Sequence, residues 1–133
     1  MLPKWHILSG FISSYIIYWF TSLTIFQASL IFLSSVLIDF DHYLWYRFKK
    51  RDWNLKNAYI YLKRHRKIYK PLMLLHTIEF HILIALLIFV WQGFFYVLVG
   101  MLFHSIFDLI DLIYTKRLYL REFSLIHFIY TNL

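Results

Sequence analysis

Basic and apolar residues are separated into long blocks along the chain. Lys and Arg are absent from residues 5–46 and again from residues 71–115, whereas ten of the fourteen fall within residues 47–70. A membrane-spanning helix needs roughly 20 mostly apolar residues, so each basic-free block has room for two spans joined by a short turn. We expect those turns near Thr21 and Gln92. The pattern therefore predicts four helices, near residues 5–20, 23–46, 71–91 and 94–115.

The composition favours the same class of protein. Hydrophobic residues make up 61% of the chain and charged residues 16%, whereas a soluble domain has ~45–50% and ~25%. So much apolar sequence excludes a disordered chain, and the absence of cysteine excludes a disulfide scaffold. We expect an all-α polytopic membrane protein with a single domain over residues 1–133.

The basic residues also predict how the chain lies in the membrane. Loops rich in Lys and Arg stay in the cytoplasm, so we expect the loop 47–70 and both termini on the cytoplasmic side of an inner or plasma membrane. Residues 53–68 predict a basic helix interleaved with aromatic residues and capped by Asp52, which suits anionic lipid head groups. The tail, residues 116–133, is expected either at the membrane interface or packed on the bundle. Membrane lipids are the expected partners, nucleic acid is not expected because the loop is held at the membrane, and homo-oligomer formation stays open.

Acidic residues and histidines lie where a membrane protein normally avoids them. Five of the seven acidic residues fall inside the predicted spans, and so do four histidines beyond the first span. A charge at the bilayer centre costs ~2.5–3.5 kcal/mol even on the mildest scale. Counting about 1.5 Å per residue along each helix places most of these groups at one level in the cytoplasmic half, on three helices. They therefore indicate a functional site. The residues are Asp39, Asp41, His42, His76, Glu79, His81, His104, Asp108 and Asp111.

The spacing of these residues favours a metal site. His104, Asp108 and Asp111 follow one helical stripe at i, i+4 and i+7, and His76 and Glu79 share another at i, i+3. The expected helix ends place carboxylates near C-termini, where negative charge is disfavoured, so a cation must balance them. That cation is either a loop Lys or Arg or, as the neighbouring histidines favour, a divalent metal. Imidazole and carboxylate ligands without thiolate suit zinc first, with manganese or iron as alternatives, and one or two ions.

Two short motifs resemble those of a known family. The string IDFDHYLW, with Asp39, Asp41 and His42, resembles the D-x-D-H motif at a helix end in membrane-bound metal-dependent hydrolases, which include the LexA-regulated inner-membrane proteins. The string GMLFHSIFDLID, with His104 and Asp108, resembles the G-x3-H-x3-D helix of the same family.

The resemblance extends to the rest of residues 1–115. His6 is similar to an early histidine of the family, and LLHTIEFHI, with His76 and Glu79, is similar to the H-[ST]-x-E-[FW] motif of its shorter members. The H-R-G-x-T-H string of longer members is missing here. The family is grouped with zinc-dependent phospholipases C, so the resemblance implies phosphoester hydrolysis.

We therefore expect a metal-dependent hydrolase that acts on a phosphoester, such as a lipid phosphate, at the cytoplasmic leaflet. A bound metal would polarise a phosphoryl oxygen and lower the pKa of a water molecule toward ~7, and Glu79 or Asp39 would take the proton as catalytic base. Two alternatives stay open, an ion or proton transporter subunit and a non-catalytic, metal-stabilised membrane scaffold. For His81 and His127 we expect only buried, hydrogen-bonded side chains. The expected metal ligands are Asp39, Asp41, His42, His76, Glu79, His104 and Asp108, with His6 and Asp111 as further candidates.

Overall fold

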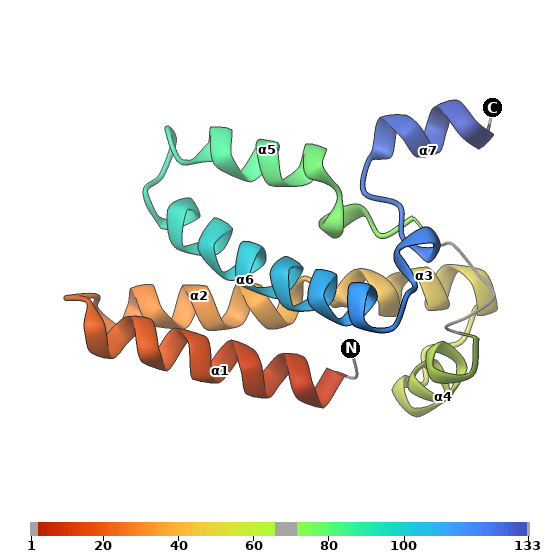
Figure 1. Ribbon diagram of the computed structural model, residues 1–133, viewed down its shortest axis with the longest axis horizontal. Helices are drawn as coiled ribbons and strands as arrows, with labels where there is room; N and C mark the ends of the chain where they lie inside the picture. Colours follow the sequence, from red (N-terminus) through yellow and green to blue (C-terminus); the bar gives the residue numbers. More distant parts are fainter. Residues whose placement is uncertain (1–2, 66–71, 133) are drawn as a thin grey trace.

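The computed structural model describes residues 3–65 and 72–132, and every regular element in those ranges is helical (Figure 1). The expected all-α fold is therefore confirmed for the described chain. The elements are α1 (Pro3–Phe20), α2 (Ile25–Leu37), α3 (Phe40–Lys50), α4 (Leu55–His65), the 3₁₀ turn η1 (Leu74–His76), α5 (Ile78–Leu87), α6 (Gly93–Tyr114), the 3₁₀ turn η2 (Leu118–Leu120) and α7 (Leu125–Asn132).

Helices α2 and α6 form the centre of the bundle. Helix α1 packs against both of them, and α5 packs against α6 on the other side (Figure 1). The buried apolar core lies between the end of α2, α5 and α6, where Ile38, Ile84 and Met101 meet. Helix α2 begins at a capping box, in which Thr24 and Gln27 each accept a hydrogen bond from the other's backbone N–H. The core thus packs α2 against α6 below the level of the polar residues.

A glycine allows α2 and α6 to approach closely. A Cβ atom added at Gly100 would collide with the carbonyl oxygen of Ile31 and with the side chain of Ser34 on α2. Between α1 and α2 the equivalent contact is Gly10 against the Ser35 side chain. Small residues at such crossings are typical of helices that pack in membranes, because association there depends on close van der Waals contact.

The polypeptide from α2 to α3 contains a tightened turn. The backbone N–H of Asp39 donates to Val36, and that of His42 donates to Asp39, in place of the usual partners four residues earlier. A 3₁₀ turn within a helix often marks a functional position. This one leaves the Ser35 carbonyl without its usual helical partner, the Asp39 N–H. The expected helix over 23–46 is therefore present as two segments, α2 and α3, that meet at Asp39.

A second interruption precedes α5. The expected helix over 71–91 is not continuous, because residues 74–76 form the separate turn η1 and α5 covers only Ile78–Leu87. Thr77 is fully buried, and its hydroxyl accepts a hydrogen bond from the N–H of Phe80, which caps α5. Residue 71 itself lies outside the described residues. The expected helices over 5–20 and 94–115 match α1 and α6 closely.

Among the described residues, two helical stretches are long and apolar enough to cross a membrane, Ile25–Lys50 and Gly93–Tyr114. The first consists of α2 and α3 together, and the second is α6. Helices α1 and α5 are not among them. Large apolar side chains cover the outside of the bundle, and Phe20 and Phe89 are 82% and 88% exposed. Contiguous apolar surface of this kind is typical of a membrane or protein contact.

The basic loop folds into α4, which packs against α3. Asp52 is not the cap that the sequence predicted, because Asn54 takes that position and accepts hydrogen bonds from the N–H groups of Lys56 and Asn57. Asp52 instead accepts hydrogen bonds from the Tyr46 hydroxyl and the Asn54 N–H, and these donors lower the pKa of its carboxyl. Residues 66–68 of the predicted loop helix lie outside the described residues.

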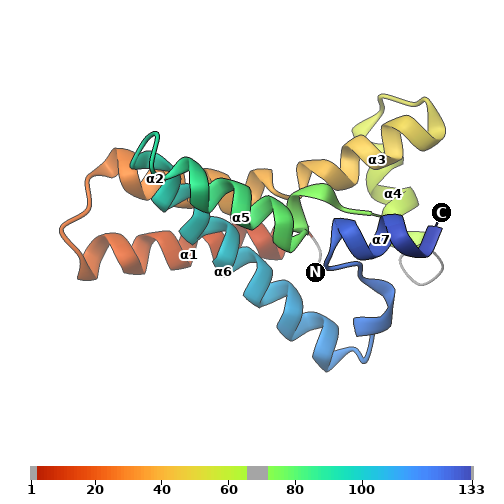
Figure 2. The ribbon, with the colours of Figure 1, turned by 90° about the horizontal axis from the view of Figure 1, so that it is seen from above.

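The tail returns to the bundle. After α6 the chain forms η2 and α7, and Figure 2 shows it turning back toward the start of α5. The N–H of Ile78 donates to the Phe123 carbonyl at 2.9 Å, and Glu122 is buried. The tail is therefore packed on the bundle beside the two interruptions, rather than only lying along its outer surface.

Candidate metal centre

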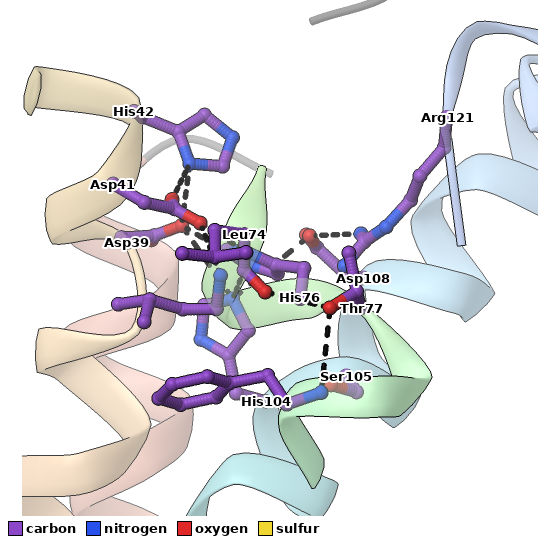
Figure 3. A network of polar contacts seen from close by, with 12 residues as sticks. Asp39, Asp41, His42, Leu74, His76, Thr77, His104, Ser105, Asp108 and Arg121 are labelled. Carbon is purple, nitrogen blue, oxygen red and sulfur yellow. Dashed lines mark hydrogen bonds and ion pairs between the residues drawn. The ribbon is translucent and has the colours of Figure 1, made fainter. Parts of the chain in front are cut away.

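Six of the sequence-predicted residues meet in one cluster where the two interruptions face α6 (Figure 3). Three overlapping groups within it have donor atoms that all lie within 4.8 Å of one another, and each group could hold a metal ion. The groups are His6, Asp39 and His104; Asp39, His42 and His76; and His76, His104 and Asp108. The cluster therefore joins α1, the α2–α3 junction, η1 and α6.

Hydrogen bonds fix the proton position on two of these histidines. His104 Nδ1 lies 2.7 Å from the Ser35 carbonyl oxygen, the group that the tightened turn at Asp39 releases. His76 Nδ1 lies 3.0 Å from Asp41 Oδ2. A carbonyl and a carboxylate only accept hydrogen bonds, so Nδ1 carries the proton in both rings. The Nε2 atom of each ring is then a bare lone pair, which is the form that binds metals.

The two bare nitrogens point at each other. His76 Nε2 and His104 Nε2 are 3.2 Å apart, and Asp39 Oδ1 lies 3.5 Å from the latter and 3.8 Å from the former. Two ligands on one tetrahedral zinc, with Zn–N distances of ~2.0–2.1 Å, are separated by roughly 3.3 Å. The three donor atoms thus have the chemistry and the spacing of a metal site.

Asp41 lies behind the histidines. Its buried carboxylate accepts hydrogen bonds from His42 Nδ1 at 2.8 Å, from His76 Nδ1 at 3.0 Å and from the backbone N–H of Leu75 at 3.1 Å. A carboxylate in this position orients a ligating histidine and raises its basicity. Asp41, which the sequence placed among the ligands, therefore holds His76 in place. His42 lies at the edge of the cluster, where its side chain is 35% exposed.

His6 and Asp108 complete the cluster. His6 is buried, and its Nε2 lies 3.2 Å from Asp108 Oδ1 and 3.9 Å from Asp39 Oδ2. Its ring stacks on that of His104, with centroids 4.2 Å apart. Within the described chain, His6 Nδ1 is buried with no hydrogen-bond partner, so the acceptor nearest to this ring is Asp108, at Nε2. His6, which the sequence predicted as a further candidate ligand, is therefore part of the cluster.

Arg121 is a member of the site that the sequence did not indicate. Its Nη1 donates to Asp108 Oδ2, and the ion pair is largely buried. The charge that balances the carboxylates was expected to come from a loop Lys or Arg or from a metal. In the structure, Arg121 of the tail neutralises the carboxylate of Asp108. Asp39 and Asp41 still lie among histidines. The signal in the sequence was a charged pair, Arg121 and Glu122, within a largely apolar stretch of the tail.

Glu79 lies outside the cluster, contrary to its predicted roles as ligand and base. Its carboxylate accepts hydrogen bonds from the Ser124 hydroxyl and from the N–H groups of Leu125 and Ile126, at 2.9 and 3.2 Å for the two amides. The stripe of His76 and Glu79 required a continuous helix, which the break at Thr77 removes. Glu79 therefore binds the N-terminus of α7, where negative charge is favoured.

The other acidic and histidine positions are accounted for separately. Asp111 belongs to none of the three groups found among the described residues. His81 Nδ1 lies 2.8 Å from the Thr77 carbonyl oxygen, and the Ser105 hydroxyl lies 3.2 Å from its Nε2. His127 pairs with Glu122 at 3.1 Å. His81 and His127 are thus hydrogen-bonded, as expected, but they are not buried: His81 is partly exposed and the His127 side chain is 60% exposed.

The helix ends differ from the electrostatic picture drawn from the sequence. Asp39 and Asp41 were expected at the C-terminus of a long helix, where the dipole opposes them. The break instead places Asp39 at the N-cap of α3 and Asp41 in its first turn. Asp39 makes no side-chain capping hydrogen bond, so its carboxylate is free to face the histidines. The α3 dipole therefore stabilises these two carboxylates.

No protein-family model, curated protein or solved structure matches this chain.

Proposed function

We propose that this chain is a membrane-embedded, metal-dependent hydrolase that acts on a phosphoester, such as a lipid phosphate, at the cytoplasmic leaflet. The observation that carries the proposal is the meeting of His76 Nε2, His104 Nε2 and Asp39 Oδ1 within 3.2–3.8 Å. Three lone-pair donors at that separation repel one another unless a cation lies among them. The hydrogen bonds to Ser35 and Asp41 hold the two rings in this arrangement.

Zinc suits this donor set best, and manganese or iron accept the same ligands. When bound, such an ion supplies a Lewis acid for a phosphoryl oxygen and an activated water. His76, His104 and Asp39 are the residues that hold it, with Asp108 next to them.

We assign proton transfer to His42 in place of Glu79. His42 is the most exposed of the clustered imidazoles, and its Nδ1 donates to the buried carboxylate of Asp41. That hydrogen bond orients the ring and leaves Nε2 to accept a proton. Asp39, the other predicted base, faces His42, His76 and His104 through one oxygen and serves as a ligand.

The membrane arrangement in this proposal has four crossings, with both termini cytoplasmic in an inner or plasma membrane. Helix α1 has 18 residues and thus a length of about 27 Å, close to a hydrocarbon core of ~30 Å. The segment from η1 through α5 crosses beside α6. Its broken backbone lies against the protein, which is where the bilayer tolerates such irregularity. The basic residues around α3 and α4 support the orientation.

Anionic lipid head groups are the proposed partners of the basic loop. An open cavity of about 390 Å³ lies between α3 and α4, and its lining includes the cations Lys50 and Arg64, the polar residues Tyr61 and Asn57, and one carboxylate, Asp52. Cations and hydrogen-bond donors of this kind bind phosphate. The aromatic residue Trp53 beside them is 67% exposed, as expected at a membrane interface.

The resemblance to membrane-bound metal-dependent hydrolases is the second support. Its D-x-D-H residues and its H-x3-D residues come from separate helices. They contribute Asp39, His42, His104 and Asp108 to the one cluster described above.

Elemental analysis of the purified protein tests the metal, and hydrolysis in liposomes tests the reaction. We expect a stoichiometric transition metal in the wild type and its loss in His104→Ala. We also expect metal-dependent release of phosphate or alcohol from an anionic phospholipid or isoprenoid phosphate. A wild type that binds no metal would overturn the proposal.

A non-catalytic scaffold is the second candidate, and one observation favours it. The cluster joins four segments that are distant in the sequence, so an ion there would stabilise the fold directly. Full metal binding with no release from a panel of phosphoesters, carboxyl esters and amides would support the scaffold and contradict the hydrolase.

A further inference from the structure

We infer that the centre holds two metal ions, bridged by Asp39 and Asp108, and that His6 is a ligand of the second ion. The inference rests on the proposed function and deepens it, because it assigns the number of ions and the role of a residue in α1.

The stacked rings of His6 and His104 set the distance between the two ion positions. Their centroids are 4.2 Å apart and their planes are inclined by only 20°. The Nε2 atoms of both rings face the same two carboxylates, those of Asp39 and Asp108. Two ions bound in the planes of these rings would therefore be separated by about the stacking distance, and two-metal hydrolytic sites have separations of ~3.5–4 Å.

The two carboxylates divide their oxygens between the two rings. Asp39 presents Oδ2 to His6 at 3.9 Å and Oδ1 to His104 at 3.5 Å. Asp108 presents Oδ1 to His6 at 3.2 Å and Oδ2 to His104 at 3.9 Å, and this Oδ2 also accepts a hydrogen bond from Arg121 Nη1. A carboxylate with one oxygen toward each of two imidazoles is placed to bridge two cations. Because Asp39 and Asp108 do this from different helices, the arrangement does not depend on one side chain.

The His6 ring differs from those of His76 and His104 in its hydrogen bonds, and this difference suits a ligand of a second ion. Hydrogen bonds to Ser35 and Asp41 commit the protons of His104 and His76 to Nδ1. No partner among the described residues holds a proton at either nitrogen of His6 except Asp108, which faces Nε2. The ring can therefore donate to Asp108 when the second ion is absent and bind with Nε2 when it is present.

Two ions would narrow the substrate class. In an in-line displacement at phosphorus, one ion stabilises the attacking oxygen and the other stabilises the leaving oxygen. The second site thus favours phosphoesters over carboxyl esters.

Metal stoichiometry of the full chain in detergent tests the inference. The apoprotein is equilibrated with Zn²⁺, freed of excess ion and analysed for zinc, in the wild type, His6→Gln and His81→Gln. We expect two ions per chain in the wild type and in His81→Gln, and one in His6→Gln. His81 is the matched control because it is a hydrogen-bonded histidine outside the cluster.

Electron paramagnetic resonance of the wild type loaded with Mn²⁺ gives a second readout that needs no variant. Two ions about 4 Å apart couple magnetically, so we expect the spectrum of a coupled pair. His6→Gln should give the spectrum of an isolated ion.

The outcomes separate the inference from the proposed function. One ion per chain in the wild type, two ions in His6→Gln, or two uncoupled Mn²⁺ ions would each overturn the two-ion centre and leave the hydrolase proposal standing. A wild type with no bound ion would overturn both.

Discussion

The centre is built from two kinds of backbone, one continuous and one broken. Helix α6 runs without interruption from Gly93 to Tyr114, and it contributes His104 and Asp108 one turn apart on one face. The α2–α3 junction and η1 are interrupted, and they contribute Asp39, His42 and His76. Side chains from the continuous helix have fixed spacing, whereas those from the broken segments depend on tertiary contacts.

The broken segments supply groups that a continuous helix cannot. A regular α-helix uses its own carbonyl and N–H groups internally. The tightened turn at Asp39 releases the Ser35 carbonyl, which holds His104, and the loop at η1 presents the Leu75 N–H to Asp41. The regular helix α6 thus sets the spacing of His104 and Asp108, and the interrupted segments supply the backbone groups that orient His104 and Asp41.

The largest effect should come from removing one bare nitrogen from either kind of segment. His104→Ala and His76→Ala each delete a direct ligand, so we expect metal affinity to fall by more than the ~10–100-fold typical of an orienting residue. Isothermal titration of the apoprotein with Zn²⁺ measures this. His81→Ala should bind Zn²⁺ as tightly as the wild type. Unchanged Zn²⁺ affinity in His76→Ala would show that His76 of η1 is not a ligand.

Asp41→Asn should have an intermediate effect. The amide keeps the shape of the side chain but weakens its hydrogen bonds to the His42 and His76 rings. We expect metal affinity to fall by ~10–100-fold, with the ion count unchanged at saturation. The same titration measures it, and a complete loss of binding would show that Asp41 is a direct ligand.

Gly100→Ala tests how closely the continuous helix must approach α2. The new Cβ meets the Ile31 carbonyl, which is backbone and cannot rotate away, so we expect a loss of unfolding free energy of ~1–3 kcal/mol. Gly10→Ala is the matched control, because its Cβ meets only the Ser35 hydroxyl. Thermal unfolding in detergent compares the two, and equal midpoints would contradict the close approach.

Glu79→Gln should release the tail with little effect on metal binding. The neutral amide weakens the charge-assisted hydrogen bonds that the carboxylate accepts from the start of α7. Limited proteolysis should cut faster near Ser124, while zinc affinity stays within a few fold. A loss of zinc binding with an unchanged rate of proteolysis near Ser124 would show instead that Glu79 is a metal ligand.

The smallest effect concerns Asp52, outside both kinds of segment. Its pKa is held below the ordinary value of 3.8, so its charge stabilises the α3–α4 contact fully above that pH. The contribution should fade as the pH drops from 3.8 through the lower folded-state pKa. Carboxyl chemical shifts followed by nuclear magnetic resonance measure the titration, and Asn substitution should abolish the dependence. A midpoint above 3.8 would contradict the hydrogen bonds.

What could be predicted from sequence follows the same division. The i, i+4 spacing placed His104 and Asp108 on one face of α6, because the helix is regular. The i, i+3 spacing of His76 and Glu79 wrongly predicted a shared helix face, because a buried Thr77 starts a new helix between them. The breaks at Asp39 and Thr77 leave no proline or glycine as a marker in the sequence.

Arg121 illustrates a second limit. Its role depends on a return of the chain after α6, which is fixed by backbone and side-chain contacts of Ile78 and Glu79 to residues 123–126. Contacts between segments so far apart in the sequence have no periodic signature. The calculated depth of each residue along its predicted span, in contrast, did place most of the clustered residues at one level. Charged groups inside a bilayer need partners at the same depth, so this measure identified the cluster.

The wide separation of His6 and Arg121 has a consequence for biosynthesis. These two neighbours of Asp108 are more than a hundred residues apart, and a ribosome adding ~5–20 residues per second needs roughly 6–20 s to make both. In the proposed membrane arrangement, Asp39 and Asp41 are synthesised during that interval, before His104 and Asp108 exist. The proposed ion therefore cannot bind in the finished geometry until α6 has been made.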